Sequence, residues 1–284
     1  MIQIIVNSIL LGGIYALVAS GFSLVWGVMN IINMTHGSIM MLGAYCTFYL
    51  WQMGLDPILT IPISMVIMFC FGYGLQKKII NRIINAPMWM TLVITFGMDL
   101  FIVNIVILFF TATPRSVVVS YGSLSLNLWG ISFPLIKLLA FIPAMLIILG
   151  LYSFVGKTKL GRAIQATRMD PGIAEVMGID IEKIYAITFG LGACLAAAAG
   201  SILSIYSSIT PNMGMHYTAI AFIICVLGGL GNIKAVIPAG IILGFIEGFG
   251  SFYIGTSYER AIAYASLLII LTFIPNGLFG KQYY

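Results

Sequence analysis

The stretch IIVNSILLGGIYALVASGFSLVWGV, residues 4–28, decides the class of fold. It carries no charged side chain, and the first charged residue of the chain is Asp56. A bilayer core about 30 Å thick is crossed by about 20 apolar residues in an α-helix, whereas a membrane β-barrel shows weak alternation instead of a continuous run. The stretch therefore predicts a transmembrane helix. Because no positively charged segment precedes it, we expect a retained span and not a cleaved signal.

Further apolar runs follow along the whole chain, each bounded by turn residues or charges. They predict an all-α integral membrane protein, a polytopic helical bundle of eight or nine transmembrane segments that forms one domain over 1–284. The expected helices cover 4–28, 36–52, 58–76, 91–110, 133–155, 184–205, 217–232, 237–255 and 260–276. Two segments could instead form half-helices or re-entrant segments. They are 36–52, which is short, and 217–255, which a glycine-rich turn divides.

Composition excludes other classes of protein. Of the 284 residues, 61% are hydrophobic and 7% charged, against about 25% charged in ordinary soluble domains, and the mean hydropathy is +1.10. The net charge of +5 does not indicate nucleic-acid binding, because the basic residues form no dense stripe. The four cysteines lie far apart in apolar runs, so we expect no metal site, disulfide or cofactor.

The basic residues predict an orientation, because positive charge gathers in short cytoplasmic loops. If Lys77, Lys78 and Arg82 are inside, alternation over nine crossings places ten of the 13 basic residues inside. The N-terminus is then outside and the C-terminus lies in the cytoplasm. With eight spans only the N-terminus would change side.

A polar break separates the first two expected helices and suggests a broken or re-entrant helix near 30–45. Asn30, Asn33, Thr35 and His36 gather there. Backbone exposed within a membrane needs polar partners or water, as in transporters that bind substrate where helices are broken. Two interpretations are open: the break borders a translocation path, or His36 is structural and bonds the broken backbone.

Asp99 lies inside the fourth expected span, followed by Asn104. Ionisable groups inside a membrane are costly and usually face a cavity or a partner. Asp99 could bind the ammonium group of a substrate or pair with another span, and pairing is the favoured interpretation. Glu247, in a later span, could pair with Lys137 or lie near the outer interface.

Small residues recur at four-residue spacing in two of the expected spans. Such stripes let membrane helices approach closely, so we expect helix packing there, in part at an interface with a second chain. The stripe residues are Gly192, Ala196, Gly200, Gly240, Gly244 and Gly248.

The polar connection 157–183 predicts a short helix over 171–177. Asp170 is a good N-cap, Pro171 suits the first helical position, and Gly178 can take the left-handed conformation that ends a helix. A helix about 10 Å long is unstable alone. The apolar side chains of Ile173, Ala174, Val176 and Met177 therefore predict docking, either back onto the chain's own surface or into a partner's groove.

Several motifs in the same order resemble the LivH-type permease subunit of branched-chain amino-acid ABC importers. They are GGIYALVASGFSLVWGV at 12–28, NMTHGSIMMLGAY at 33–45, the connection 157–183, LGGLGNIKAVIPAGIILG at 227–244 and LTFIPNGLFG at 271–280. The resemblance implies that the short helix is a coupling helix, seated in a cleft of an ATPase subunit. The first Glu and Ala of the family's E-A-A-x-x-x-G pattern are absent here, where Gly172 and Ile173 stand.

The resemblance also supplies the expected partners: a second, LivM-like permease, two cytoplasmic ATPase subunits and an extracytoplasmic substrate-binding protein. The residues expected at the ATPase contact are Gly161, Arg162, Asp170, Pro171, Ile173, Ala174, Glu175, Met177 and Gly178.

We therefore expect a non-enzymatic permease that moves branched-chain or hydrophobic amino acids inward by alternating access. ATP hydrolysis would occur on a partner, because the chain lacks G-x-x-x-x-G-K-[ST]. Permeases for urea, short amides or other small solutes resemble it closely and stay open as an alternative. An ion-driven carrier or channel is an alternative from another class, and a membrane enzyme is disfavoured because few His and acidic residues are present.

Overall fold

The computed structural model describes residues 1–284 except 85, 120, 123, 129–130, 274–276 and 279–284. Most of the described chain is helical. The main elements are α1 (Ile2–Met29), α2 (His36–Gln52), α3 (Pro57–Lys78), α4 (Met88–Phe110), β1 (Ser125–Leu128), β2 (Ile131–Pro134), α5 (Leu135–Lys157), α6 (Lys159–Met169), α7 (Pro171–Val176), α8 (Ile181–Ser204), α9 (Met213–Gly228), α10 (Val236–Tyr253) and α11 (Glu259–Phe273). Three 3₁₀ turns, η1 (Ile80–Arg82), η2 (Ile233–Ala235) and η3 (Thr256–Tyr258), lie between them.

The prediction of a helical membrane protein is confirmed, while the number of crossings is not. Among the described residues, six helices are at least 18 residues long and apolar enough to cross a membrane: α1, α3, α4, α5, α8 and α10. The helices α2, α9 and α11 have 17, 16 and 15 residues. Helix length and hydropathy thus identify six candidate crossings among the described residues, and the expected count of eight or nine stays a prediction.

Several boundaries differ from the prediction by a few residues, and two of them have local reasons. The helix expected over 217–232 is α9, which begins at Met213 and ends at Gly228, because Gly229 takes a positive φ of 89° that turns the chain away. The connection before α5 contains an antiparallel hairpin, in which Leu126 pairs with Phe133. The helix α5 therefore starts at Leu135 and not at 133.

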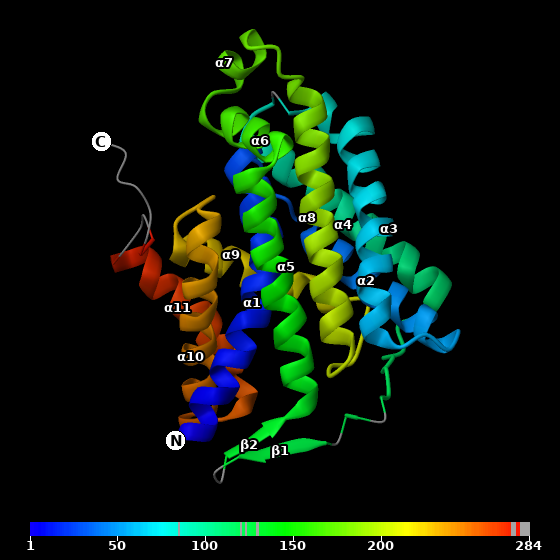
Figure 1. The fold of residues 1–284 in the computed structure, drawn as a ribbon, viewed down its shortest axis with the longest axis vertical. Coiled ribbons are helices and arrows are strands. Elements are labelled where there is room, and N and C mark those ends of the chain that lie inside the picture. Colours follow the sequence, from blue (N-terminus) through cyan, green and yellow to red (C-terminus); the bar gives the residue numbers. More distant parts are fainter. Residues whose placement is uncertain (85, 120, 123, 129–130, 274–276, 279–284) are drawn as a thin grey trace.

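The helices α1 and α8 form the centre of the bundle. The helix α1 packs against α10, α8, α9 and α5, while α8 packs against α3, α2 and α1. Figure 1 shows α1, α5 and α8 side by side along the long axis, with α6 and α7 at one end. The N-terminus and the β1–β2 hairpin lie at the opposite end. We call these the α7 end and the hairpin end.

The small-residue stripes lie where the central helices meet their neighbours. A Cβ on Gly244 would stand 2.8 Å from the Cα of Gly12 in α1, and one on Gly240 would stand 2.9 Å from the Cβ of Ala16. Gly248 faces Ser8 of α1, and a Cβ on Gly192 would stand 2.5 Å from Val25. Gly200 faces the Met40 carbonyl of α2, and Ala196 is fully buried in α8. Both stripes thus face helices of the same chain.

The buried carboxyl of Glu247 is also explained by a helix pair within the chain. The Tyr15 hydroxyl of α1 donates a hydrogen bond of 2.7 Å to Glu247 Oε2 of α10. Glu247 is only 1% exposed. Tyr15 is therefore a partner of Glu247 within the chain, which the sequence did not indicate.

Candidate functional site

The break between α1 and α2 places the start of α2 at half the depth of α1. The helix α1 ends at Met29, Asn30 takes the left-handed conformation with φ 52°, and α2 begins at His36. His36 Nε2 lies 2.8 Å from the carbonyl oxygen of Val18, in the middle of α1. Residues 30–35 therefore run back alongside α1 without helical hydrogen bonds.

Thr95 of α4 supplies the polar partner for this irregular backbone. The Met34 N–H donates to Thr95 Oγ1 at 3.2 Å, and the Thr95 hydroxyl donates to the Ile32 carbonyl at 2.8 Å. Asn33 Oδ1 accepts from the Thr35 N–H at 3.1 Å and from the Thr35 hydroxyl. Backbone groups buried in apolar surroundings need such partners. The sequence analysis missed Thr95, because nothing local to residue 95 indicates a contact with residues 32–34.

His36 is buried at this joint. Its ring meets the Phe22 ring edge to face, with centroids 5.6 Å apart, and its side chain is 1% exposed. A carbonyl can only accept a hydrogen bond, so Nε2 carries the hydrogen toward Val18. His36 thus ties the first turn of α2 to the middle of α1.

The other predicted path residues do not all gather at the joint. The half-buried carboxyl of Asp99 interacts with the hydroxyl and backbone N–H of Ser38 in the first turn of α2. A carboxyl there is favoured by the partial positive charge of a helix N-terminus. Asn104 is exposed and donates to the Leu100 carbonyl of its own helix at 2.7 Å. Asn30 is exposed at the end of α1.

The helix α9 begins beside the start of α2. A Cβ on Gly214 would lie 2.5 Å from the carbonyl carbon of Gly37, so only glycine allows this approach. The Thr218 hydroxyl donates to the Gly214 carbonyl at 3.1 Å. Two short helices therefore meet by their first turns inside the bundle.

The second feature is an exposed apolar surface at the α7 end (Figure 1). Asp170 Oδ1 accepts from the Ile173 N–H at 2.9 Å and begins α7, which ends at Val176, one residue earlier than predicted. Gly178 follows with φ 84°. We define the apolar tip as four side chains that are 65–87% exposed: Met169, Ile173, Val176 and Met177.

The remaining residues of the predicted contact support the tip or surround it. Ala174 is 3% exposed and anchors α7, which packs on α6 and α8. Gly161 lets the first turn of α6 sit against α5, since a Cβ there would lie 2.6 Å from the Cα of Val155. Pro171, Arg162 and Glu175 are exposed. Of the four apolar side chains expected to dock, Ala174 packs against the chain itself, whereas Ile173, Val176 and Met177 are exposed.

The chain has long apolar helices, a helix that starts inside the bundle and an exposed apolar tip at one end. These features define a polytopic helical membrane protein. Comparison with known proteins identifies the family of this chain. The model of the family described as "Branched-chain amino acid transport system / permease component" matches residues 4–271, and the chain belongs to that family. The resemblance noted from the sequence motifs is thereby confirmed.

Relatives extend over nearly the whole chain. The chain is 31% identical to the high-affinity branched-chain amino acid transport system permease protein BraD of Pseudomonas aeruginosa, over 99% of this chain and 96% of that protein. It is 30% identical to LivH of Escherichia coli K12, of the same description, with the same coverage. The solved structure of PsaBC from Streptococcus pneumoniae in complex with Fab shares the fold, with a TM-score of 0.50, 12% identity and coverage of 95% and 91%.

Proposed function

We propose that this chain is the permease subunit of a prokaryotic ABC importer and carries branched-chain amino acids inward across the cytoplasmic membrane. The observation that carries the proposal is the apolar tip, which exposes four large apolar side chains beyond the end of the bundle. Such a surface costs free energy in water and is stabilised when a partner covers it. Family membership and the names of BraD and LivH support the class of solute.

In this proposal the α7 end is cytoplasmic and the hairpin end is outside, which places the N-terminus outside. Exposed Lys77, Lys78, Lys157 and Lys159 lie at the α3 and α5 ends nearest α7, as positive charge on the cytoplasmic side requires. With α2, α9 and α11 counted beside the six long helices, the chain crosses eight or nine times. The predicted cytoplasmic C-terminus and Lys281 lie outside the described residues.

The proposed mechanism is alternating access. Two cytoplasmic ATPase subunits each receive a coupling helix, one from this chain and one from a LivM-like second permease. ATP binding closes the ATPase dimer. The closed dimer binds one conformation of the permease pair more favourably than the other, and this difference in binding free energy drives the conformational change. The helix α7 packs on α8 and α6, and α6 packs on α1 and α5, so displacement of the tip reaches the central helices of the bundle.

The proposed translocation path follows the joint where α2 and α9 begin. Asn33, Thr35, His36 and Asp99 lie around it. Because Asn104 is exposed from the chain, it would face a cavity shared with the second permease. An extracytoplasmic binding protein would release the amino acid into this cavity from the hairpin end.

One purification tests the proposal. The tagged chain is isolated in mild detergent and its companions are identified; a second permease, two ATPase subunits and a binding protein are expected. The reconstituted complex is then assayed for ATP hydrolysis with each binding protein loaded with leucine or urea. Stimulation by the leucine-loaded protein supports the proposal, while stimulation by urea alone contradicts the solute and isolation without any ATPase contradicts the class.

A further inference from the structure

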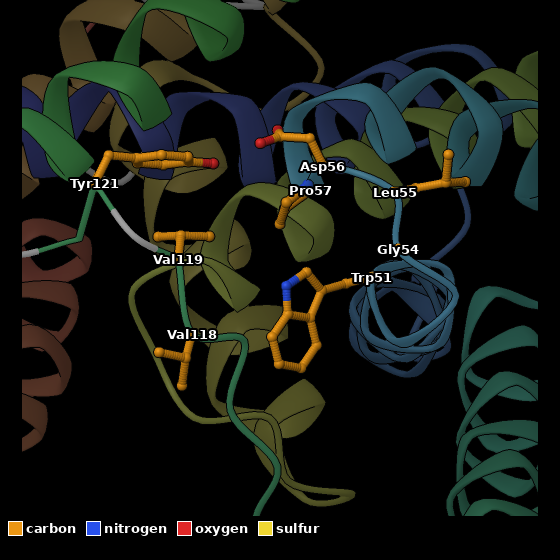
Figure 2. A pocket seen from close by; sticks show the side chains of 8 residues that line it. All are labelled: Trp51, Gly54, Leu55, Asp56, Pro57, Val118, Val119 and Tyr121. Carbon is orange, nitrogen blue, oxygen red and sulfur yellow. The ribbon is translucent and has the colours of Figure 1, made fainter.

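A pocket of about 310 Å³ lies at the hairpin end, where the α2–α3 turn meets the connection that follows α4 (Figure 2). Its lining combines aromatic and aliphatic side chains with one carboxylate. The residues that line it are Trp51, Gly54, Leu55, Asp56, Pro57, Val118, Val119 and Tyr121. The pocket belongs neither to the α2–α9 joint nor to the apolar tip.

Backbone contacts hold both walls of the pocket in place. Asp56 is the N-cap of α3, and its Oδ1 accepts from the Ile58 N–H at 2.9 Å. The connection after α4 is pinned to the α8–α9 connection, because Arg115 and Ile209 exchange hydrogen bonds of 2.9 and 2.7 Å. Trp51 belongs to the last turn of α2. The hollow is therefore framed by two segments that lie far apart in the sequence rather than by one loop.

The charge in the pocket is uncompensated within the described part of the chain. Asp56 forms no ion pair there, and it is the one exposed carboxylate at the hairpin end whose side chain the structure describes. The guanidinium group of Arg115 makes other contacts: it donates to the Phe110 carbonyl at 3.1 Å and lies over the Phe48 ring. Burial and the neighbouring Asp56 raise the pKa of Tyr121, so the phenol stays neutral.

The chemistry of this lining suits a cation on an apolar stem. Figure 2 shows the Tyr121 hydroxyl pointing toward the Asp56 carboxylate, with the Trp51 indole on the other side of the hollow. Cations bind to aromatic faces and carboxylates together, and the stems of Lys and Arg pack on apolar surface such as Val118 and Val119. A volume near the lower limit of ligand pockets fits one side chain better than a whole large ligand.

We infer that the pocket of Trp51, Asp56 and Tyr121 receives a Lys or Arg side chain of the extracytoplasmic binding protein and so docks that protein on the permease. This inference rests on the proposed function, because it requires a binding protein at the hairpin end. Charge complementarity selects the occupant: one carboxylate without an ion pair faces the side from which a binding protein would approach.

The test measures the dissociation constant of the binding protein for the reconstituted transporter. Asp56→Asn removes the charge and keeps an N-cap acceptor for α3, so folding is preserved. Asp56→Asn should weaken docking about tenfold and Asp56→Lys about a hundredfold, in the range of interfacial charge pairs. Trp51→Leu should weaken docking more than Trp51→Phe, and added salt should weaken the wild type more than Asp56→Asn.

Met53→Lys is the matched control, because Met53 is 78% exposed on the same turn and does not line the pocket. It changes the net charge by +1, as Asp56→Asn does, and should change docking less than about threefold. Equal weakening by Met53→Lys and Asp56→Asn would overturn the inference. So would slower leucine uptake by Asp56→Asn with unchanged docking, which would assign the pocket to the free solute.

If the binding protein docks equally on wild type and Asp56→Asn, only this inference fails. If no binding protein docks on the wild type, the proposed function fails as well.

Discussion

Shortening two side chains of the apolar tip should separate the ATPase subunits from the permease without harming the fold. Val176 is 87% exposed and Ile173 65%, so most of each side chain contributes nothing to the packing of the chain itself. Full burial of such a side chain stabilises by about 1.5–3 kcal/mol. Scaled by the exposed fractions, Ile173→Ser with Val176→Ser loses about 3 kcal/mol of binding free energy, which is about a hundredfold in the dissociation constant.

The assay titrates purified ATPase subunits onto the detergent-solubilised permease pair and follows binding and thermal unfolding together. Met177→Ser and Met53→Ser form a matched comparison, because both methionines are 78% exposed but lie at opposite ends. The first should weaken ATPase binding about tenfold and the second should leave it unchanged. Wild-type affinity in the double variant would refute the coupling role of the tip, and a lowered melting temperature would show that the tip packs within the chain.

Four further perturbations test other parts of the structure. Gly178→Pro should abolish uptake while membrane insertion persists, because proline cannot adopt the φ of 84° after α7; normal uptake would contradict this. Gly244→Leu should lower the melting temperature by forcing α10 from α1, whereas Gly74→Leu should not, since no atom stands within 4 Å of a Cβ there. Thr95→Val should cost about 2–4 kcal/mol by leaving two backbone groups of the break without partners, and Thr95→Ser should restore most of it. His36→Gln tests the joint: unchanged uptake at unchanged expression would exclude His36 from the path.

Local patterns in the sequence were sufficient wherever a short segment determines its own structure. The expected helix over 36–52 coincides with α2, and the Asp170 side chain caps α7. Both follow from side chains within a few residues of the helix ends. The break after Asn30 was visible for the same reason, because polar residues interrupt an apolar run.

Contacts between distant segments were not predictable in this way. Thr95 reaches the backbone of residue 32 across 63 positions, and Tyr15 reaches Glu247 across 232. Serine, threonine and tyrosine occur throughout the spans, so their presence does not identify a partner. The start of α9 was misplaced because the approach of Gly214 to Gly37 depends on tertiary packing, not on the apolar run that defined the prediction.

The half-depth start of α2 has a consequence for the order in which the chain assembles. The helix α2 packs chiefly on α8, and it also packs on α3 and α9. Ribosomal synthesis delivers α3 soon after α2, but Ile181, where α8 begins, emerges much later than Gln52, where α2 ends. A nascent chain stopped before residue 181 therefore holds α2 without the surface that buries it. Completion of α8 is the step at which α2 gains most of its packing surface, so biogenesis of the joint depends on the second half of the chain.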